Sequence, residues 1–362
     1  MKRFAGCLYL LPLFFSLLAA CSGGPSPAAK NPGAAEDTAF WEEFGNLLTF
    51  PASEAELPVS SFPEIWGYVV AGRESALSKN LPLSDIGYFG AEIDAYGKLT
   101  DVPNPRNIRN FSGRVHLVVA CNSRSLTHFV LMEGSAERKA LIADLLTAAK
   151  NFTGLQIDFE YIPQRDGGAF LSFLGDLRAG LGGKMFTIAL PARTRPVNND
   201  VFDYRKIKPL VDRILVMAYD EHWSASAPGP IASLSWCRRV AEYALAEIGP
   251  EKLIMGLPFY GRAWGSTNPS KAYLYSSIKN LLDENHITEI RRENGIPTFN
   301  YEVPVKVRVY YEDAFSLSAR MELYKALGVR HIGFWRLGQE TPVVWKLLRL
   351  GNEDHLIGAR SR

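Results

Sequence analysis

Positions 152–161 of the 362-residue chain read FTGLQIDFEY, an alternation of apolar and polar residues typical of a buried β-strand. Successive side chains of a strand point to opposite faces, so Gln156, Asp158 and Glu160 share one face and the apolar residues between them share the other. We expect the three polar groups to point into the interior of a closed barrel. A carboxylate pair there is costly unless it is hydrogen-bonded or functional, which makes Asp158 and Glu160 the first candidates for a site.

Seven further runs rich in β-branched and aromatic residues resemble this strand, and helical patterns lie between them. The eight strand candidates cover residues 65–70, 85–91, 114–120, 154–159, 185–190, 213–219, 252–257 and 331–335. The helical patterns include residues 136–150, 167–181, 236–248 and 316–327. Eight strands that alternate with helices predict an α/β fold, a closed (β/α)8 barrel, and favour it over an open doubly wound sheet.

One long segment, residues 265–309, interrupts this repeat between the seventh strand and its helix. The segment contains helix-like and strand-like pieces of its own, and we predict a small inserted α+β subdomain. Loops at the C-terminal rim surround the active sites of such barrels. The insertion is therefore expected to form a wall of a substrate groove.

The composition excludes several classes of function. With 47% hydrophobic residues the chain can bury a large core, and a formal net charge of +2 gives no field that favours nucleic acid as a partner. The glycine-rich phosphate-binding motifs of nucleotide enzymes are absent from the sequence. We therefore expect no nucleotide cofactor, and we expect any polymeric ligand to be recognised by shape and aromatic contact.

The N-terminus carries the pattern of an export signal. Lys2 and Arg3 precede an apolar run over residues 8–20, which is too short to span a membrane as a helix. The run ends in LAAC at 18–21, which resembles the bacterial lipoprotein box, where the signal is removed and the cysteine, here Cys21, receives lipid. Ser22 after this cysteine favours the outer membrane, if the organism has one. A plain signal peptide with an incidental cysteine is the alternative.

This interpretation divides the chain into a signal peptide at 1–20, a flexible tether at 21–61, a barrel domain at 62–350 and a tail at 351–362. The tether is predicted from its Ser, Gly, Pro and Ala content. Cys121 and Cys237 are the cysteines that remain, and neither lies in a metal-ligand spacing. We expect two buried free thiols and no metal site, although in an exported protein this pair is also able to form a disulfide.

Polar and aromatic residues also gather at the end of the sixth predicted strand. Tyr219 and Asp220 close an apolar run and are followed by Glu221, His222 and Trp223. A phenol and a carboxylate at this rim are able to hold a polar substituent of a ligand. The alternative is that Tyr219 is a core aromatic and that residues 221–223 form a solvated loop.

The stretch around Asp158 and Glu160 resembles the Asp-x-x-Asp-x-Asp-x-Glu signature of glycoside hydrolase family 18. Three later segments resemble the motifs of this family on its sixth, seventh and eighth strands, in that order: MAYD at 217–220, GLPFYGR at 256–262 and GFW at 333–335. EHW at 221–223, followed by PGP at 228–230, is similar to the bacterial branch that includes spore-cortex-lytic N-acetylglucosaminidases. The resemblance covers roughly residues 63–350.

The resemblance implies roles for the matching residues. Glu160 would protonate the glycosidic oxygen, and Asp158 would orient and stabilise the N-acetyl group of the substrate, whose oxygen is the nucleophile in this family. Tyr219 would act with these two by holding the acetamido group, and Trp335 would form the floor under the distorted sugar. The substrate-binding residues implied by the motifs are Asp220, Gln156, Trp335, Tyr68, Trp223, Tyr260 and Arg262.

The sequence departs from the signature at Thr153 and Gln156, which stand where the family has its first two aspartates. We expect Thr153 to be structural. Gln156 removes a carboxyl group able to share a proton with Asp158, so the acidity of the site is expected to differ. The spore-lytic branch also tends to carry an amide at this position.

These features together predict a retaining N-acetylglucosaminidase or chitinase at the cell envelope, acting as a monomer on peptidoglycan or a chitin-like glycan. Two alternatives stay open. One is a catalytically silent glycan-binding lipoprotein on the same barrel, against which the presence of both Asp158 and Glu160 argues. The other is a structural lipoprotein without a ligand, which would require the rim aromatics to be buried by neighbouring loops. These aromatics are Trp223, Tyr260, Trp264 and Trp335.

Overall fold

The computed structural model describes residues 32–45, 48, 50–109, 111–265, 270–302 and 306–351. The predicted signal peptide at 1–20, the lipidation site Cys21 and the predicted tail beyond Gly351 lie outside the described residues. Within the described ranges, no helix is both long enough and apolar enough to cross a membrane.

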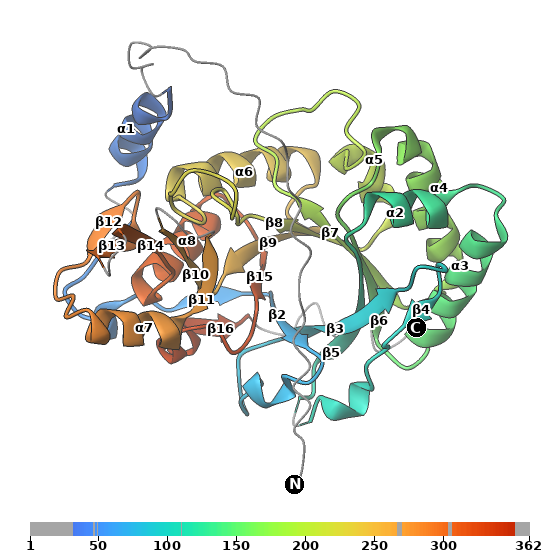
Figure 1. Cartoon of the computed structure of the whole chain (residues 1–362), viewed down its shortest axis with the longest axis horizontal. Helices are drawn as coiled ribbons and strands as arrows, with labels where there is room; N and C mark the ends of the chain where they lie inside the picture. Colours follow the sequence, from blue (N-terminus) through green and yellow to red (C-terminus); the bar gives the residue numbers. More distant parts are fainter. Residues whose placement is uncertain are drawn as a thin grey trace, which may run out of the picture.

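Eight parallel strands form a closed barrel at the centre of the protein (Figure 1). The ring is closed by β2, which pairs with both β15 and β3. In ring order the strands are β2 (Glu64–Val70), β3 (Asp85–Ile93), β5 (Arg114–Cys121), β6 (Gly154–Phe159), β7 (Met185–Pro191), β8 (Arg213–Met217), β9 (Leu253–Pro258) and β15 (His331–Trp335). The predicted (β/α)8 barrel is confirmed. The sixth strand was predicted to cover residues 213–219, but β8 ends at Met217. Tyr219 therefore lies beyond the end of this strand.

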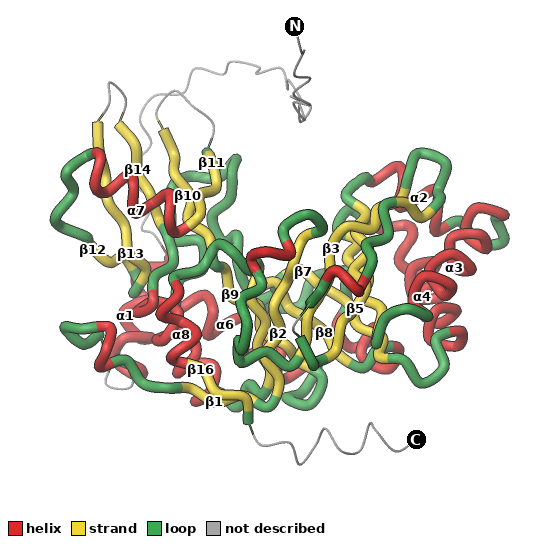
Figure 2. Tube along the Cα trace, turned by 90° about the horizontal axis from the view of Figure 1, so that it is seen from below, coloured by secondary structure: helices red, strands yellow, loops and turns green. Residues whose placement is uncertain are grey.

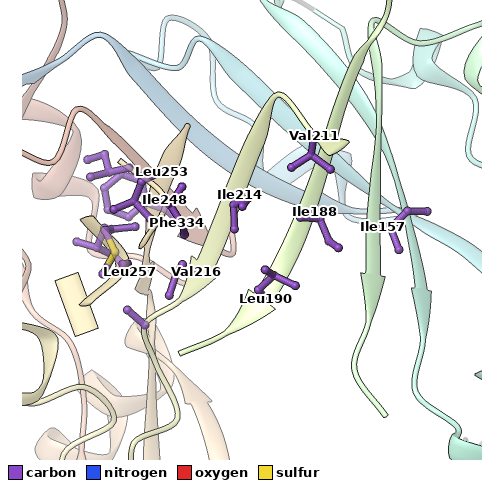
Figure 3. Close-up of a cluster of buried hydrophobic side chains, with 14 of the residues drawn as sticks. Ile157, Ile188, Leu190, Val211, Ile214, Val216, Ile248, Leu253, Leu257 and Phe334 are labelled. Carbon is purple, nitrogen blue, oxygen red and sulfur yellow. The ribbon is translucent and has the colours of Figure 1, made fainter. Parts of the chain in front are cut away.

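Helices surround the barrel, and the main core lies between them and the outer face of the strands (Figure 1). The surrounding helices are α2 (Arg124–Leu131), α3 (Ala136–Ala149), α4 (Gly167–Gly180), α5 (Tyr204–Ile207), α6 (Leu234–Glu247) and α8 (Ala314–Ala326). The apolar face of the 152–161 stretch points outward, where the Phe159 ring stacks 5.8 Å from that of Phe173 on α4. Figure 3 shows the same arrangement on neighbouring strands, with Ile188, Leu190, Ile214 and Val216 in one apolar cluster. The strand alternation therefore leaves Gln156 and Asp158 facing the barrel interior.

A network of charged side chains fills the end of the barrel at which the parallel strands begin, the N-terminal end. Arg114 donates to Asp85 at 2.6 Å and to Glu64 at 2.8 Å, and Arg213 donates to Glu64 at 2.8 Å. His116 lies 2.7 Å from Asp85. Burial by itself would raise the pKa of Asp85, but the hydrogen bonds from His116 and Arg114 lower it to about 2. The interior charges at this end are thus paired, and their role is structural.

The insertion is a five-stranded antiparallel sheet that stands beside the barrel (Figure 2). Its elements are β10 (Tyr260–Gly265), β11 (Lys271–Leu274), α7 (Tyr275–Glu284), β12 (Arg291–Glu293), β13 (Ile296–Glu302) and β14 (Lys306–Tyr310). Ile278 of α7 packs on one face of this sheet with Ala263, Phe299 and Val309. The sheet begins at Tyr260, before the predicted start of the insertion at residue 265. Two candidate site residues, Tyr260 and Arg262, therefore belong to the inserted sheet.

The expectation of a flexible tether over residues 21–61 is wrong for the part that the structure describes. Helix α1 (Pro32–Phe44) lies beside α6, with Phe40 only 1% exposed. The indole nitrogen of Trp41 donates to Asn294 at 3.4 Å, and Glu43 forms an ion pair of 2.8 Å with Arg238. Strand β1 (Ser60–Phe62) pairs in parallel with β16 (Leu348–Leu350). The aromatic side chains of α1 bury enough apolar surface to dock the helix, which composition alone did not indicate.

Strand β4 (Leu99–Thr100) forms a hairpin with the end of β3.

Cys121 and Cys237 are both buried and neither forms a disulfide, which confirms the prediction of two free thiols.

Candidate active site

A pocket of about 550 Å³ opens at the C-terminal end of the barrel strands. Its walls come from seven barrel strands or the loops that follow them, from α6, and from β10 and β11 of the insertion. The insertion therefore contributes to the wall of this pocket. Nine of the ten candidate site residues line it, namely Tyr68, Gln156, Asp158, Glu160, Tyr219, Asp220, Tyr260, Arg262 and Trp335.

Strand β6 brings two unlike carboxyl groups to this pocket. Asp158 is 6% exposed and lies inside the barrel, whereas Glu160 follows the last residue of β6 and opens into the pocket. The backbone amide of Glu160 donates to the carbonyl of Cys121 at 3.2 Å, which ties this rim position to β5. The alternation of the strand thus places both carboxyl groups on one side, at different depths.

Both carboxyl groups hold their protons more tightly than usual. Burial raises the pKa of Asp158 to about 8, and the charge of Glu160 adds to the shift. Burial also raises the pKa of Glu160, and here the added charge is that of Asp220. Glu160 is exposed to solvent and lines the pocket. Perturbed carboxyl groups in a pocket are typical of acid–base chemistry.

An aromatic cluster forms another wall of the pocket. The ring of Trp335 lies 5.8 Å from that of Tyr68 and 4.6 Å from that of Phe89. Tyr68 is almost completely buried, and a Cβ atom at Gly87 would lie 2.3 Å from its ring, so only glycine fits there. Phe89 was not among the candidate residues, although the alternation of its predicted strand places it on the same side as Gly87.

A second cluster joins the loop after β8 to the insertion. Asp220 accepts hydrogen bonds from the Tyr260 hydroxyl at 2.5 Å and from Arg262 at 3.2 Å. The ring of Tyr219 meets that of Tyr260 edge to face at 6.4 Å, and a Cβ atom at Gly256 would lie 2.8 Å from the Tyr219 ring. The pKa of Tyr219 is raised well above its usual value by burial and by the charge of Asp158. Tyr219 is therefore a neutral hydroxyl near both Asp158 and Asp220.

Trp223 is the candidate residue that the structure does not bring into the pocket. Its side chain is 52% exposed, on a loop that is held in place by its neighbours. Glu221 accepts from the backbone and hydroxyl of Ser233 at 2.7 and 3.0 Å, and His222 contacts the carbonyl of Pro230 at 2.8 Å. Glu221 and His222 thus hold the loop against the start of α6 rather than contact the pocket.

The remaining rim aromatics differ in exposure. Tyr260 and Trp264 are 5% and 7% exposed, but Tyr260 still lines the pocket. Trp264 instead lines a second hollow beside β13 and β14.

Among the described residues, no group of three or more His, Cys, Asp or Glu side chains is arranged to hold a metal ion. The residues that line the pocket include the carboxyl groups of Asp158, Glu160 and Asp220 and the phenols of Tyr68, Tyr219 and Tyr260.

Thr187 was also missed by the sequence analysis. It lies on β7 directly opposite Gln156 of β6, and the Gln156 amide donates to its hydroxyl at 3.0 Å. Its inward position follows from the alternation of β7, but its partner depends on the register between two strands. The sequence therefore contained a signal for its position and none for its contact.

Comparison with known proteins gives three kinds of match. The sequence profile of the family described as "Glycosyl hydrolases family 18" matches residues 80–340. The uncharacterized glycosylase YvbX of Bacillus subtilis is 28% identical over 238 residues, covering 62% of this chain and 69% of that protein. The cortical fragment-lytic enzyme of Bacillus anthracis is 27% identical over 289 residues, covering 74% and 67%. The solved spore cortex-lytic enzyme SleL of Bacillus cereus shares the fold, with a TM-score of 0.72 at 24% identity over 80% of this chain and 74% of that one.

Proposed function

The chain belongs to glycoside hydrolase family 18 and is a glycoside hydrolase, and we propose that it cleaves β-linked glycans that contain N-acetylglucosamine. We propose a retaining reaction in which the acetamido group of the substrate is the nucleophile, the route that this family uses as an exception to the two-carboxylate scheme.

The observation that carries this proposal is the pair of unlike carboxyl groups in one pocket. Glu160 is open to the pocket, and its raised pKa favours the protonated form that a general acid requires. Asp158 is buried deeper in the barrel, with the hydroxyl of Tyr219 nearby. We therefore assign Glu160 to the glycosidic oxygen, and Asp158 to the acetamido group rather than to the sugar carbon.

The proposed reaction has two steps. In the first, Glu160 gives its proton to the glycosidic oxygen as the bond from that oxygen to C1 breaks, and the acetamido oxygen bonds to C1 from the opposite face. The cyclic oxazolinium that forms is positively charged, and Asp158 stabilises it. In the second step, water bonds to C1 and gives a proton to Glu160, the ring opens, and the enzyme returns to its first state. Two inversions leave the product with the β configuration.

The other pocket residues serve binding in this proposal. Tyr219 and Asp220 hold the acetamido group, and Tyr260 and Arg262 hold Asp220 in place through their hydrogen bonds. Trp335, packed against Tyr68, forms the floor under the sugar at which cleavage occurs. Aromatic faces suit this role because sugar rings present apolar C–H surfaces to them.

The names of the similar proteins bear on the substrate. They refer to cortical fragments for the Bacillus anthracis enzyme, to spore cortex for the Bacillus cereus enzyme and to chitinases for several others. We propose that this chain acts on peptidoglycan or on a chitin-like polymer, which share the acetamido group that the reaction requires.

The place of action is proposed from the N-terminal sequence. The LAAC stretch at 18–21 supports export and lipid attachment at Cys21, which would hold the enzyme at the cell envelope. We expect Cys21→Ser to release the protein from the membrane fraction or to stall its processing, without a change in the activity of the soluble enzyme. Continued fractionation with membranes would contradict lipid attachment at Cys21.

The function is tested by product analysis. The purified protein is incubated with peptidoglycan and with chitin oligomers, side by side, and the products are identified by mass spectrometry. We expect fragments that end in a reducing N-acetylated sugar from at least one substrate, and none with Glu160→Gln. Binding of both substrates without any cleavage would reject the proposed hydrolysis and indicate a glycan-binding protein.

A further inference from the structure

Glu221, the residue directly after Asp220, has a carboxylate to which the proposed function assigns no role. It is half-buried, and both of its oxygens are occupied by the start of α6. Ser233 donates its backbone N–H to one oxygen at 2.7 Å and its hydroxyl to the other at 3.0 Å. The backbone amide of Glu221 donates to the carbonyl of Ile231 at 2.8 Å. Three hydrogen bonds thus close the loop from residue 221 to residue 233 at its base.

The far side of this closure is anchored in the protein core. Arg320 of α8 is fully buried and donates to the carbonyl of Ala232 at 2.6 Å. The same guanidinium forms a bidentate ion pair with the buried carboxylate of Glu312, at 2.9 and 3.0 Å. Glu312 lies two residues beyond the end of β14, where the chain leaves the inserted sheet. A bidentate pair of this kind has a fixed geometry, so the segment at residues 232 and 233 has a rigid support.

These contacts form a closed path that passes through the pocket. Strand β14, which leads to Glu312, pairs with β10 of the same sheet. Strand β10 carries Tyr260 and Arg262, whose side chains donate to Asp220. Asp220 precedes Glu221 in the chain, and Glu221 leads back to the core through the loop closure. The inserted sheet therefore holds Asp220 by its side chain, and the barrel core holds it by its backbone.

The backbone of Asp220 depends on such support. Its φ of 57° lies in the left-handed region, which residues other than glycine seldom adopt. A residue keeps this conformation only where the surrounding structure fixes it. The hydrogen bonds of Glu221 supply this fixation on the C-terminal side of Asp220. Without them the backbone is free to relax toward a negative φ, which turns the Asp220 carboxylate away from Tyr260.

We propose that Glu221 is a positioning residue: by closing the loop against Ser233, it holds Asp220 in the conformation in which its carboxylate reaches Tyr260 and the pocket. Glu221 is not among the residues that line the pocket, so it acts through Asp220. The consequence for turnover rests on the proposed function, in which Asp220 holds the acetamido group. The geometric part of the inference does not depend on the reaction.

The position of Asp220 is measured first without substrate, by proton NMR of the full protein. The Tyr260 hydroxyl is buried and makes a short hydrogen bond to a carboxylate, so we expect its proton to exchange slowly and to give a signal far downfield of an ordinary phenol. Its loss in Tyr260→Phe assigns this signal. Glu221→Ala should abolish the signal or move it upfield, because Asp220 withdraws from the phenol.

Two further variants separate this role from a general loss of stability. Glu221→Gln should keep the signal, because its amide offers an acceptor for the Ser233 N–H and a donor for the Ser233 hydroxyl oxygen. Asp203→Ala is the matched control and should also keep it. Asp203 accepts from two backbone amides at the start of α5, but it lies outside the pocket that holds Asp220.

Turnover of a chitin oligomer gives the second measurement. Glu221→Ala should lower kcat/KM by about tenfold or more, the effect of losing one hydrogen bond to a charged group, while Glu221→Gln and Asp203→Ala stay close to the wild type. In an Asp220→Ala background, where no carboxylate remains to be positioned, Glu221→Ala should lower kcat/KM by less than about twofold. Losses that fail to add in this way identify residues that act through one another.

Three results would overturn the inference: a downfield signal that is absent from the wild type or unchanged in Glu221→Ala, an equal change in Asp203→Ala, or losses of kcat/KM that add in the double variant. If Glu221→Ala does not fold, Ser233→Ala takes its place. It removes one of the two contacts to the Glu221 carboxylate and should move the signal upfield, and an unchanged signal would again overturn the inference. The NMR comparison requires no substrate, so an absence of hydrolysis alongside the expected NMR change would reject the proposed function alone.

Discussion

The hydroxyl of Tyr260 donates a 2.5 Å hydrogen bond to Oδ1 of Asp220, and this contact joins the inserted sheet to the loop after β8. Arg262, on the same face of β10, donates to the same oxygen at 3.2 Å. Asp220 adopts a φ of 57°, which is uncommon for a residue other than glycine. The carboxylate at this corner of the pocket is therefore oriented by the insertion and not by its own loop alone.

Tyr260→Phe should lower kcat/KM by about tenfold or more. It removes a hydrogen bond to a charged group, worth about 1.5–3 kcal/mol, and 1.36 kcal/mol corresponds to a factor of ten. Steady-state kinetics on a chitin oligomer measures the effect, and Tyr273→Phe on the neighbouring strand is the control. Equal losses in the two variants would show that the phenol acts through the stability of the sheet rather than through Asp220.

Glu160→Gln should lower turnover by roughly 10²- to 10⁴-fold, the usual contribution of a general acid, because the amide has no proton of suitable acidity to donate. Sugar binding and the thermal midpoint of unfolding should stay close to those of the wild type. Glu133→Gln, at an exposed position outside the pocket, is the matched control. Full activity in Glu160→Gln would remove this residue from the proposed reaction.

Asp220→Asn should move the basic limb of the pH–activity profile to lower pH. Glu160 must be protonated to act as an acid, so activity is lost as the pH rises through its pKa. The charge of Asp220 adds to the raised pKa of Glu160, and its removal lets Glu160 lose its proton at lower pH. Asp144→Asn, on the exposed side of α3, should leave the limb in place. A shift to higher pH in Asp220→Asn would contradict the electrostatic coupling.

Substrate assistance makes a prediction about products and inhibitors. A substrate deacetylated at the cleaved sugar should not be hydrolysed, because it lacks the internal nucleophile. A thiazoline that mimics the oxazolinium should inhibit, and Asp158→Asn should lose activity because the amide cannot offset the positive charge. NMR recorded before mutarotation should show the newly formed reducing end as the β-anomer. The α-anomer, or cleavage of the deacetylated substrate at an equal rate, would exclude this mechanism.

Phe40→Ala should loosen helix α1 without altering the pocket. Phe40 is almost fully buried, and loss of a buried phenylalanine side chain costs about 3 kcal/mol or more when the cavity cannot close. We expect faster hydrogen exchange over residues 32–45 and unchanged kinetics on short oligomers. Val59→Ala, at a position 50% exposed, serves as the control. Unchanged exchange in α1 would show that Phe40 does not hold the helix.

The sequence by itself determined the barrel and the direction of its central side chains. Strand β6 covers Gly154–Phe159, the predicted range, and Asp158 and Glu160 reach the pocket as the alternation of their strand requires. These features depend on a period of two residues, which is a local property of a strand and can be read from neighbouring positions. The other seven strands are predicted from short runs rich in β-branched and aromatic residues, which are also a local property of the sequence.

Only the tertiary structure decided which residues meet across strands and loops. Thr187 faces Gln156 because of the register between β6 and β7, and Tyr260 reaches Asp220 because β10 of the inserted sheet lines the same pocket. Trp223 stays outside the pocket, although it follows Asp220 closely in sequence. Such contacts are set by the packing of segments distant in the chain, and no local periodicity records them.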